Sequence, residues 1–326
     1  MNCYRELLSG LSYRPLYCTP WWLEAAVGQV SRLGVLTAGS PEDPVAALPI
    51  FEPVHGVVTV PPFCQYTGPV GAELPIGASF VRRTSGAAQE AHREIIRQLG
   101  AYHAWEVHLL PGQEDWLPYK EAGARAVPYM THRLSLSRGT ERVRAGYNQL
   151  LRRKIRSFAV HNPHFSVEEG RAEDLIRLSA GVIRRTGRSR FYQLSLNRLI
   201  QAAVSRDQGF VLAVYASGAA APAADMPLAV LFMAWEQDVA YYIAGARDEK
   251  NPLAADALAF LTDEALARCA ARGIREVDFE GSMVPGVAFF YRSLGGLPVS
   301  YLRISRGALT PIQRLKRKLY YKKYIL

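Results

Sequence analysis

Two carboxylates stand at the end of a predicted strand, in the stretch EVDFEG at residues 276–281. Val277 and Phe279 alternate there with Asp278 and Glu280, which places both carboxylates on one face of a strand that a glycine then ends. Because like charges repel and a sheet partly excludes water, one of the two becomes a better base near neutral pH. The alternatives are a solvent-facing strand edge and a pair of acids satisfied by arginines.

A helix carrying Tyr291 is predicted directly after this strand, and it ends at the double glycine 295–296. Val287, Phe290 and Tyr291 share one side of that helix at its 3.6-residue period. A tyrosine hydroxyl can protonate a leaving group, although a helical tyrosine also serves to pack and to bond a carbonyl. We therefore expect Tyr291 to be the acid partner of the two carboxylates.

A longer helix is predicted before the carboxylate strand, beginning at Asn251 and ending at Gly273. Asn251 is a favourable N-cap, and Pro252 suits the first helical position. The preceding strand, VAYYIAGA, runs into this helix, so backbone N–H groups near Gly245 and at the helix N-terminus are suited to a phosphate or a developing oxyanion. The alternative is a helix that only packs.

Composition limits the class of protein. The 326 residues are 49% hydrophobic, which suits two ordinary domains or one large one. The four cysteines are scattered, so neither a metal site nor a disulfide framework is predicted, and reduced thiols in the cytoplasm are expected. Residues 1–18 lack the apolar core of a secretory signal, and the uncharged run 209–224 is too short and too broken to span a bilayer.

The net charge of +10 is concentrated in two stretches. Residues 301–326 hold eight Lys or Arg and no acid, and residues 138–156 contain the sequence LLRRKIRSF. Both stretches suit an anionic partner: RNA, a lipid surface or a phosphorylated donor. The alternative is a solvated helix face together with a loose terminal segment.

Both halves of the chain are mixed α/β, with strand pairs followed by a helix and a return strand. The order of elements resembles tandem proteins of the GNAT acyltransferase superfamily, and more specifically those related to the Fem-type peptidoglycan bridge aminoacyltransferases. The resemblance rests on the stretches WWLEAAVG with PVAALPIF, PPFCQYTGPVG, NQLLRRKIRSF, and NPLAADALAF with VDFEGSMVPGVAFFYRSLGG.

The resemblance implies two GNAT-like domains in tandem, each a mixed, mostly antiparallel sheet flanked by helices. The predicted division is an N-terminal domain at 1–140, a basic connecting helix at 141–163, a catalytic domain at 164–308 and a basic amphipathic tail at 309–326. Ile312, Leu315, Leu319 and several tyrosines of that tail could lie at a membrane interface under the basic residues.

The resemblance also implies transfer of an acyl or aminoacyl group to an amine. Ordinary GNAT members bind the pyrophosphate of coenzyme A with a glycine-rich loop, but the corresponding loop here, ARDEKNPLAADA, lacks those glycines and carries two acids that Arg247 and Lys250 only partly offset. Fem-type enzymes take an aminoacyl group from tRNA, although the helical hairpin that many of them carry has no counterpart here. The donor is therefore expected to be an acyl-CoA, another thioester or an aminoacyl-tRNA, with no tightly bound cofactor and no metal.

The reaction requires a base for the amine, donors for the oxyanion and an acid for the leaving group. We assign Glu280 or Asp278 as base and Tyr291 as acid. Gly245, Arg247, Lys250 and Asn251 are expected at the donor. Acceptor-side residues are predicted at Gln65, Tyr66, Arg190 and Tyr192, lining a cleft between the domains, and Ser282 is a further predicted substrate-binding residue. For Gln65 and Tyr66 the alternative is an ordinary proline-rich turn.

Three functions follow. The first is a cytoplasmic N-acyltransferase acting on a small-molecule amine. The second is a Fem-like enzyme acting on a lipid-linked envelope precursor at the inner membrane surface, to which the tail would bind. The third is a catalytically inactive GNAT-fold module that binds nucleic acid such as tRNA.

Overall fold

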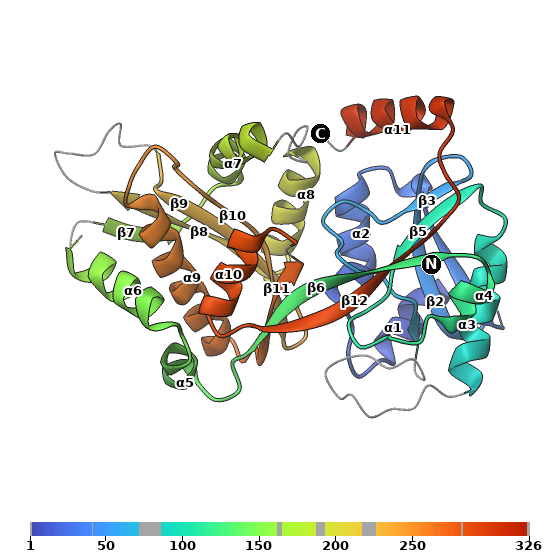
Figure 1. Ribbon diagram of the computed structural model, residues 1–326, viewed down its shortest axis with the longest axis horizontal. Coiled ribbons are helices and arrows are strands. Elements are labelled where there is room, and N and C mark those ends of the chain that lie inside the picture. The colour runs from blue at the N-terminus through green and yellow to red at the C-terminus, as the bar shows by residue number, and fades with distance from the viewer. Residues whose placement is uncertain are drawn as a thin grey trace. The chain divides into compact units, whose positions relative to one another are not determined.

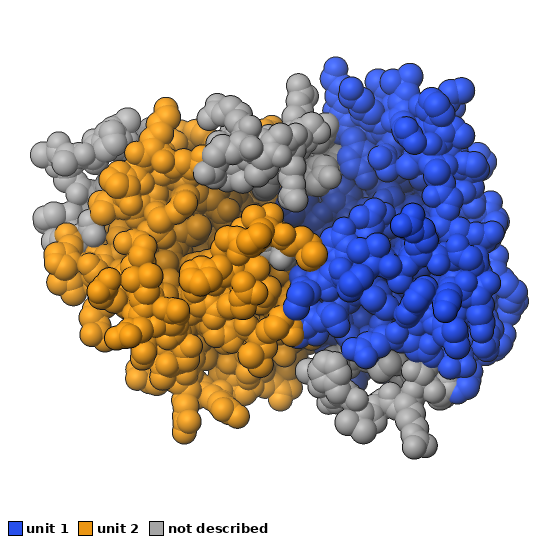
Figure 2. Space-filling model, viewed as in Figure 1, with its two compact units in different colours: residues 1–130, 299–326 blue, residues 131–298 orange. Residues whose placement is uncertain are grey.

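The computed structural model (Figure 1) describes residues 2–40, 42–71, 86–161, 165–186, 193–216, 226–281 and 283–324. The chain forms two compact units, one made of Met1–Met130 with Val299–Leu326 and the other of Thr131–Pro298 (Figure 2). Two strands, β6 (Arg125–Ser135) and β12 (Leu297–Arg306), therefore begin in one unit and end in the other.

The first unit contains a mixed sheet in the order β1-β2-β3-β5-β12-β6. Its amphipathic helix α3 (Gly86–Leu99) buries Ala91, Ile95, Ile96 and Leu99 against this sheet, as the 3.6-residue spacing predicts. Its other elements are α1 (Asn2–Ser9), η1 (Leu16–Cys18), α2 (Pro20–Val27), η2 (Val30–Arg32), β1 (Leu33–Gly39), β2 (Pro44–Val54), β3 (Val57–Thr59), β4 (Val70–Gly71), β5 (Ala104–His108), α4 (Leu117–Glu121) and α11 (Pro311–Tyr324).

The second unit continues from β6 in the order β6-β11-β10-β9-β8-β7. Its strands pair antiparallel except β10 and β11, which are parallel. Its elements are α5 (Thr140–Ala145), α6 (Gln149–His161), β7 (Phe165–Glu169), α7 (Ala172–Thr186), α8 (Gln193–Val204), β8 (Gly209–Ala216), β9 (Ala229–Glu236), β10 (Val239–Arg247), α9 (Ala254–Ala271), β11 (Glu276–Gly281) and α10 (Pro285–Ser293). The predicted fold class, mixed sheets flanked by helices, is confirmed.

The structure divides the chain differently from the predicted boundaries. The basic tail folds as α11 within the first unit, because its tyrosines join an apolar cluster there. The predicted connecting helix is two helices, α5 and α6, and both belong to the second unit, where α6 buries Leu151 and Phe158.

Helix α9 begins later than predicted. Its first residue is Ala254 and its N-cap is Leu253, so the assignment of Asn251 as N-cap is wrong. The side chain of Asn251 still pairs with a backbone group nearby, since its Oδ1 accepts a hydrogen bond from the Leu253 N–H at 2.9 Å. Apolar residues at helical spacing form its inward face, with Ala257, Leu261, Ala265 and Cys269 all fully buried.

Candidate active site

The two parallel strands of the second unit separate at their carboxyl ends. Residues 239–241 of β10 pair with residues 276–278 of β11, and the ladder then stops although β10 runs on to Arg247 and β11 to Gly281. On its other edge β10 bulges at Ile243, where its register with β9 shifts. This opening between neighbouring strands exposes backbone groups at the point where the predicted catalytic residues lie.

Asp278 lies at the last paired position and is fully buried. Its Oδ1 accepts hydrogen bonds from the Thr131 hydroxyl and, at 2.9 Å, from the Glu280 N–H. Its Oδ2 accepts from Arg133 Nε at 3.1 Å, and Arg133 also binds Glu276. Asp278 therefore fits the alternative interpretation, in which arginine pairs with the acid. Its carboxylate links Thr131, Arg133 and the Glu280 N–H at the end of the strand.

Glu280 interrupts the regular strand. Its φ of 62° lies in the left-handed region, which residues with a side chain seldom adopt, and the ladder between β11 and β6 shifts between Asp278 and Gly281. The simple alternation of the sequence therefore ends at Phe279, and the Glu280 side chain takes a direction that the pattern could not give. The bond to Asp278 holds this conformation, and Glu280 is only 8% exposed.

Tyr291 reaches this strand end from α10. Its ring stacks on Phe279 with centroids 4.9 Å apart and an interplanar angle of 14°. Burial raises the pKa of its hydroxyl well above the usual value, and the nearby Tyr242, Glu280 and Asp278 raise it further. Its hydroxyl has no hydrogen-bond partner among the described residues. The raised pKa keeps this hydroxyl protonated, so it can donate a hydrogen bond or a proton to a bound group.

His132 is a candidate that the sequence reasoning missed. It is 2% exposed on β6, and in the described part of the chain neither ring nitrogen has a hydrogen-bond partner. Its ring centroid is 5.9 Å from that of Tyr291. Burial and the charge of Arg292 lower its pKa, against a smaller opposing effect of Asp278. The sequence does contain a sign of this residue, since His132 occupies an inward position of an alternating strand. A buried imidazole without a partner can bind a water molecule or a substrate group.

Gly245 lies in the part of β10 that has left the ladder with β11, and it is exposed. A Cβ at this position would lie 1.9 Å from the hydroxyl oxygen of Tyr242, so the Tyr242 side chain requires glycine here. Glycine thereby leaves the backbone accessible at this position, and its expected contact with the donor stays a prediction.

Several backbone N–H groups of the loop between β10 and α9 donate hydrogen bonds to acceptors within the same loop. The Lys250 N–H donates to Asp248 Oδ1 at 3.0 Å and the Leu253 N–H to Asn251 Oδ1 at 2.9 Å, while the Asn251 N–H donates to the Asp248 carbonyl at 3.2 Å. Arg247 is half-buried at the end of β10. The N–H groups of Lys250, Asn251 and Leu253 are thus engaged by the loop's own acceptors, which leaves fewer loop N–H groups for a phosphate.

A basic helix lies beside this loop. Lys154 of α6 binds Asp256 in the first turn of α9 at 3.0 Å, and Arg152, Arg153 and Arg156 of α6 are exposed. Among the residues that the structure describes, these three arginines form no ion pair. The α6 surface therefore offers uncompensated positive charge next to the α9 N-terminus.

The first unit holds the predicted acceptor residues Gln65 and Tyr66. Tyr66 is fully buried, with its ring 5.2 Å from Tyr17 and 5.6 Å from Tyr301, which makes it part of the aromatic core. Gln65 is half-buried, and its Oε1 accepts a hydrogen bond from the Tyr301 hydroxyl at 3.0 Å. Of the two side chains, only that of Gln65 is partly accessible to solvent.

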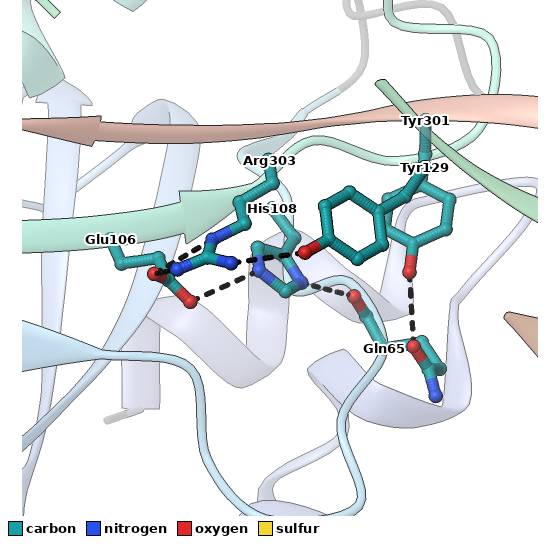
Figure 3. Close-up of polar contacts among 6 residues, drawn as sticks. All are labelled: Gln65, Glu106, His108, Tyr129, Tyr301 and Arg303. Atoms are coloured by element: carbon teal, nitrogen blue, oxygen red, sulfur yellow. Dashed lines mark hydrogen bonds and ion pairs between the residues drawn. The ribbon is translucent and has the colours of Figure 1, made fainter. Parts of the chain in front are cut away.

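Gln65 belongs to a polar network on β5, β6 and β12 (Figure 3). His108 contacts the Gln65 carbonyl through Nδ1 at 2.6 Å and Glu106 through Nε2 at 3.3 Å. Arg303 donates to Glu106 through Nε at 2.8 Å and to the Tyr129 hydroxyl at 3.0 Å. Burial raises the pKa of Glu106, but its bonds to His108 and Arg303 outweigh burial and lower it overall. The network fixes Gln65 at the half-buried edge of the first unit.

Arg190, Tyr192 and Ser282 lie outside the described residues. Within the described ranges no group of three or more His, Cys, Asp or Glu side chains could hold a metal ion. In those same ranges no helix has both the length and the apolar character needed to cross a bilayer.

Comparison with known proteins identifies the fold. Residues 145–289 match the family model of the acetyltransferase (GNAT) domain. FemX superposes with a TM-score of 0.63 at 10% identity, over 96% of this chain and 97% of that chain. A tandem GNAT protein from the clavulanic acid biosynthesis pathway gives 0.55 at 12% over 93% of each chain. L-PGS from Bacillus licheniformis gives 0.54 at 12% over 93% and 92%. No curated protein sequence matches.

Proposed function

We propose that this chain, whose residues 145–289 match the GNAT domain and whose fold is that of tandem GNAT proteins, moves an acyl or aminoacyl group from an activated donor to an amine. The observation that carries the proposal is the opening between β10 and β11, with Glu280 in a left-handed conformation on one side and the Tyr291 hydroxyl beside it. Strained backbone at such an opening is typical of residues that act on a substrate.

Each residue then has one task. Glu280, directly or through a water molecule, removes a proton from the attacking amine, whose nitrogen bonds to the donor carbonyl carbon. Backbone N–H groups of β10 near Gly245 hold the oxyanion. When the carbon–sulfur or carbon–oxygen bond of the donor breaks, Tyr291 gives its proton to the departing atom. Asp278 holds Glu280 in place through its N–H and is a positioning residue.

The donor loop and α6 favour an aminoacyl-tRNA over a coenzyme A thioester. Three N–H groups of the loop are engaged internally, the loop carries Asp248 and Glu249, and the exposed arginines of α6 suit a polyanion. A lipid-linked amine is the alternative acceptor to a small molecule.

Donor identity is tested first, by thermal shift with coenzyme A, acyl-CoAs, and charged and uncharged tRNA. We expect stabilisation by charged tRNA that weakens as salt rises, and reduced binding by Arg152→Glu/Arg153→Glu. Stabilisation by coenzyme A alone, unaffected by these changes, would overturn the tRNA assignment and leave acyl transfer standing.

Catalysis is tested with the donor so identified and a panel of amines. Glu280→Gln should lower kcat at least about 100-fold with an unchanged thermal midpoint, because a general base contributes about 10²–10⁴ in rate. The control is Glu276→Gln, the same change on the same strand, which should keep its activity. Tyr291→Phe should cost more with an ester donor than with a thioester, because an alcohol oxygen needs the proton more than a thiolate does. Equal rates for Glu280→Gln and the parent protein would remove Glu280 from the mechanism.

A further inference from the structure

Helix α11 is attached to the first unit by one side only. Tyr320 is 8% exposed, with its ring 5.7 Å from Phe51 and its hydroxyl donating to the Val27 carbonyl at 3.4 Å. Tyr321 also lies near Phe51, and Tyr324 lies 5.0 Å from Tyr320. The aromatic residues of the helix are therefore turned towards the protein.

The opposite side of α11 is an exposed apolar stripe. Ile312, Leu315 and Leu319 are 67%, 58% and 58% exposed. Their spacing of three and four residues aligns them along one face of the helix. Nothing in the described chain covers them, and a helix that served only as a solvated surface would not need three large aliphatic side chains in line.

Basic residues border this stripe on both sides. At 100° per residue, Lys318 and Lys322 flank it on one side and Lys316 and Lys323 on the other. The helix has no acidic residue, and none of these lysines forms an ion pair with any described residue. An apolar stripe between rows of positive charge is the surface of a helix that lies in a membrane interface.

We propose that this face of α11 docks onto an anionic lipid surface. Ile312, Leu315 and Leu319 enter the boundary between headgroups and acyl chains, while the lysines contact lipid phosphates. A nucleic-acid surface is less well matched, because the tyrosines that would stack on bases are engaged by the first unit. The inference stands apart from the acyl transfer, since no residue of α11 belongs to the candidate active site.

The test is flotation of the full chain with vesicles of phosphatidylcholine alone or with about a third replaced by phosphatidylglycerol. We expect binding to the anionic vesicles to be at least about tenfold stronger, and to fall about tenfold or more in Lys318→Glu/Lys322→Glu. Leu315→Ser/Leu319→Ser should lose about tenfold or more through the lost apolar burial. These variants leave the tyrosine side untouched, so their thermal midpoints should match the parent protein.

The matched control is Arg152→Glu/Arg153→Glu on α6, which removes the same charge elsewhere and should leave vesicle binding unchanged. Equal binding to neutral and anionic vesicles, or vesicle binding that ignores the α11 changes, would overturn the proposal. So would tRNA binding that the lysine changes abolish and the leucine changes spare, in a protein that does not float with vesicles. That last result would identify α11 as a nucleic-acid surface.

Discussion

The backbone of Glu280 gives a prediction that needs no substrate. A left-handed backbone destabilises the folded state by about 1–2 kcal/mol when the residue has a Cβ, and glycine lacks this penalty. Glycine instead destabilises the folded state by about 0.5–1 kcal/mol relative to alanine, because it loses more backbone entropy on folding. With φ at 62°, Glu280→Gly should therefore be more stable than Glu280→Ala by roughly 1 kcal/mol. Both variants remove the carboxylate, so the difference between them isolates the backbone.

The assay must report on the second unit alone, and Cys269 allows this. It is the one cysteine between residues 131 and 298, and it is fully buried. Its labelling by a thiol reagent in increasing urea, located by mass spectrometry, measures the free energy of unfolding of that unit. The control is Gln201 in α8, an exposed position with ordinary helical geometry, where glycine should instead be less stable than alanine by about 1 kcal/mol.

The sign of the difference decides the question. If alanine at position 280 equals or exceeds glycine, Glu280 is not held in the left-handed region and the strained strand end is refuted. If the glycine variant is the more stable one at position 280 and the less stable one at position 201, the left-handed backbone at position 280 is confirmed. The sequence then keeps a destabilising residue at a position where glycine would be more stable. Such a choice is expected of a residue retained for catalysis.

Three further outcomes follow from the packing. Asp278→Ala should lower the free energy of unfolding by about 3–5 kcal/mol, measured by urea denaturation, because it deprives the buried Arg133 guanidinium of its main partner. Gly245→Ala should cost about 1–3 kcal/mol in the same assay, and Tyr242→Phe in that background should recover part of the loss, since the new Cβ meets the Tyr242 hydroxyl. Burial lowers the pKa of His92 to about 4, despite the opposing charge of Asp115. The unfolded chain therefore binds the proton first, and stability that is complete above about pH 6.5 should fall by about 3 kcal/mol as the pH approaches 4, a slope that His92→Phe removes.

Individual helices show which features of the fold can be predicted from the sequence. The inward faces of α3 and α9 follow from the sequence, because apolar residues at a helical period leave one arrangement that buries them. The start of α9 was wrong, because Asn251 caps a tight turn in the loop as well as it would cap a helix. The tail was assigned as a basic amphipathic helix, but its tyrosines were expected at the membrane and instead pack on Phe51.

For the candidate site, the sequence predicts which residues take part but not what each of them does. Asp278, Glu280 and Tyr291 were selected from their types and spacing, and the structure brings them to one strand end. Their different roles were not accessible, since Asp278 and Glu280 look alike in a strand pattern. The bonds from Thr131 and Arg133, more than a hundred residues away in the chain, mark out Asp278, whereas a left-handed backbone marks out Glu280.

The sequence by itself determined the mixed α/β class, the resemblance to tandem GNAT proteins and the stretch in which the chemistry lies, because these depend on local periodicity and on the order of elements. The tertiary structure alone decided where β10 leaves β11, which groups bind the Asp278 carboxylate, that His132 is buried without a hydrogen-bond partner among the described residues, and which side of α11 is exposed. These features arise from contacts between segments distant in the chain, and such contacts are set by packing rather than by any local pattern.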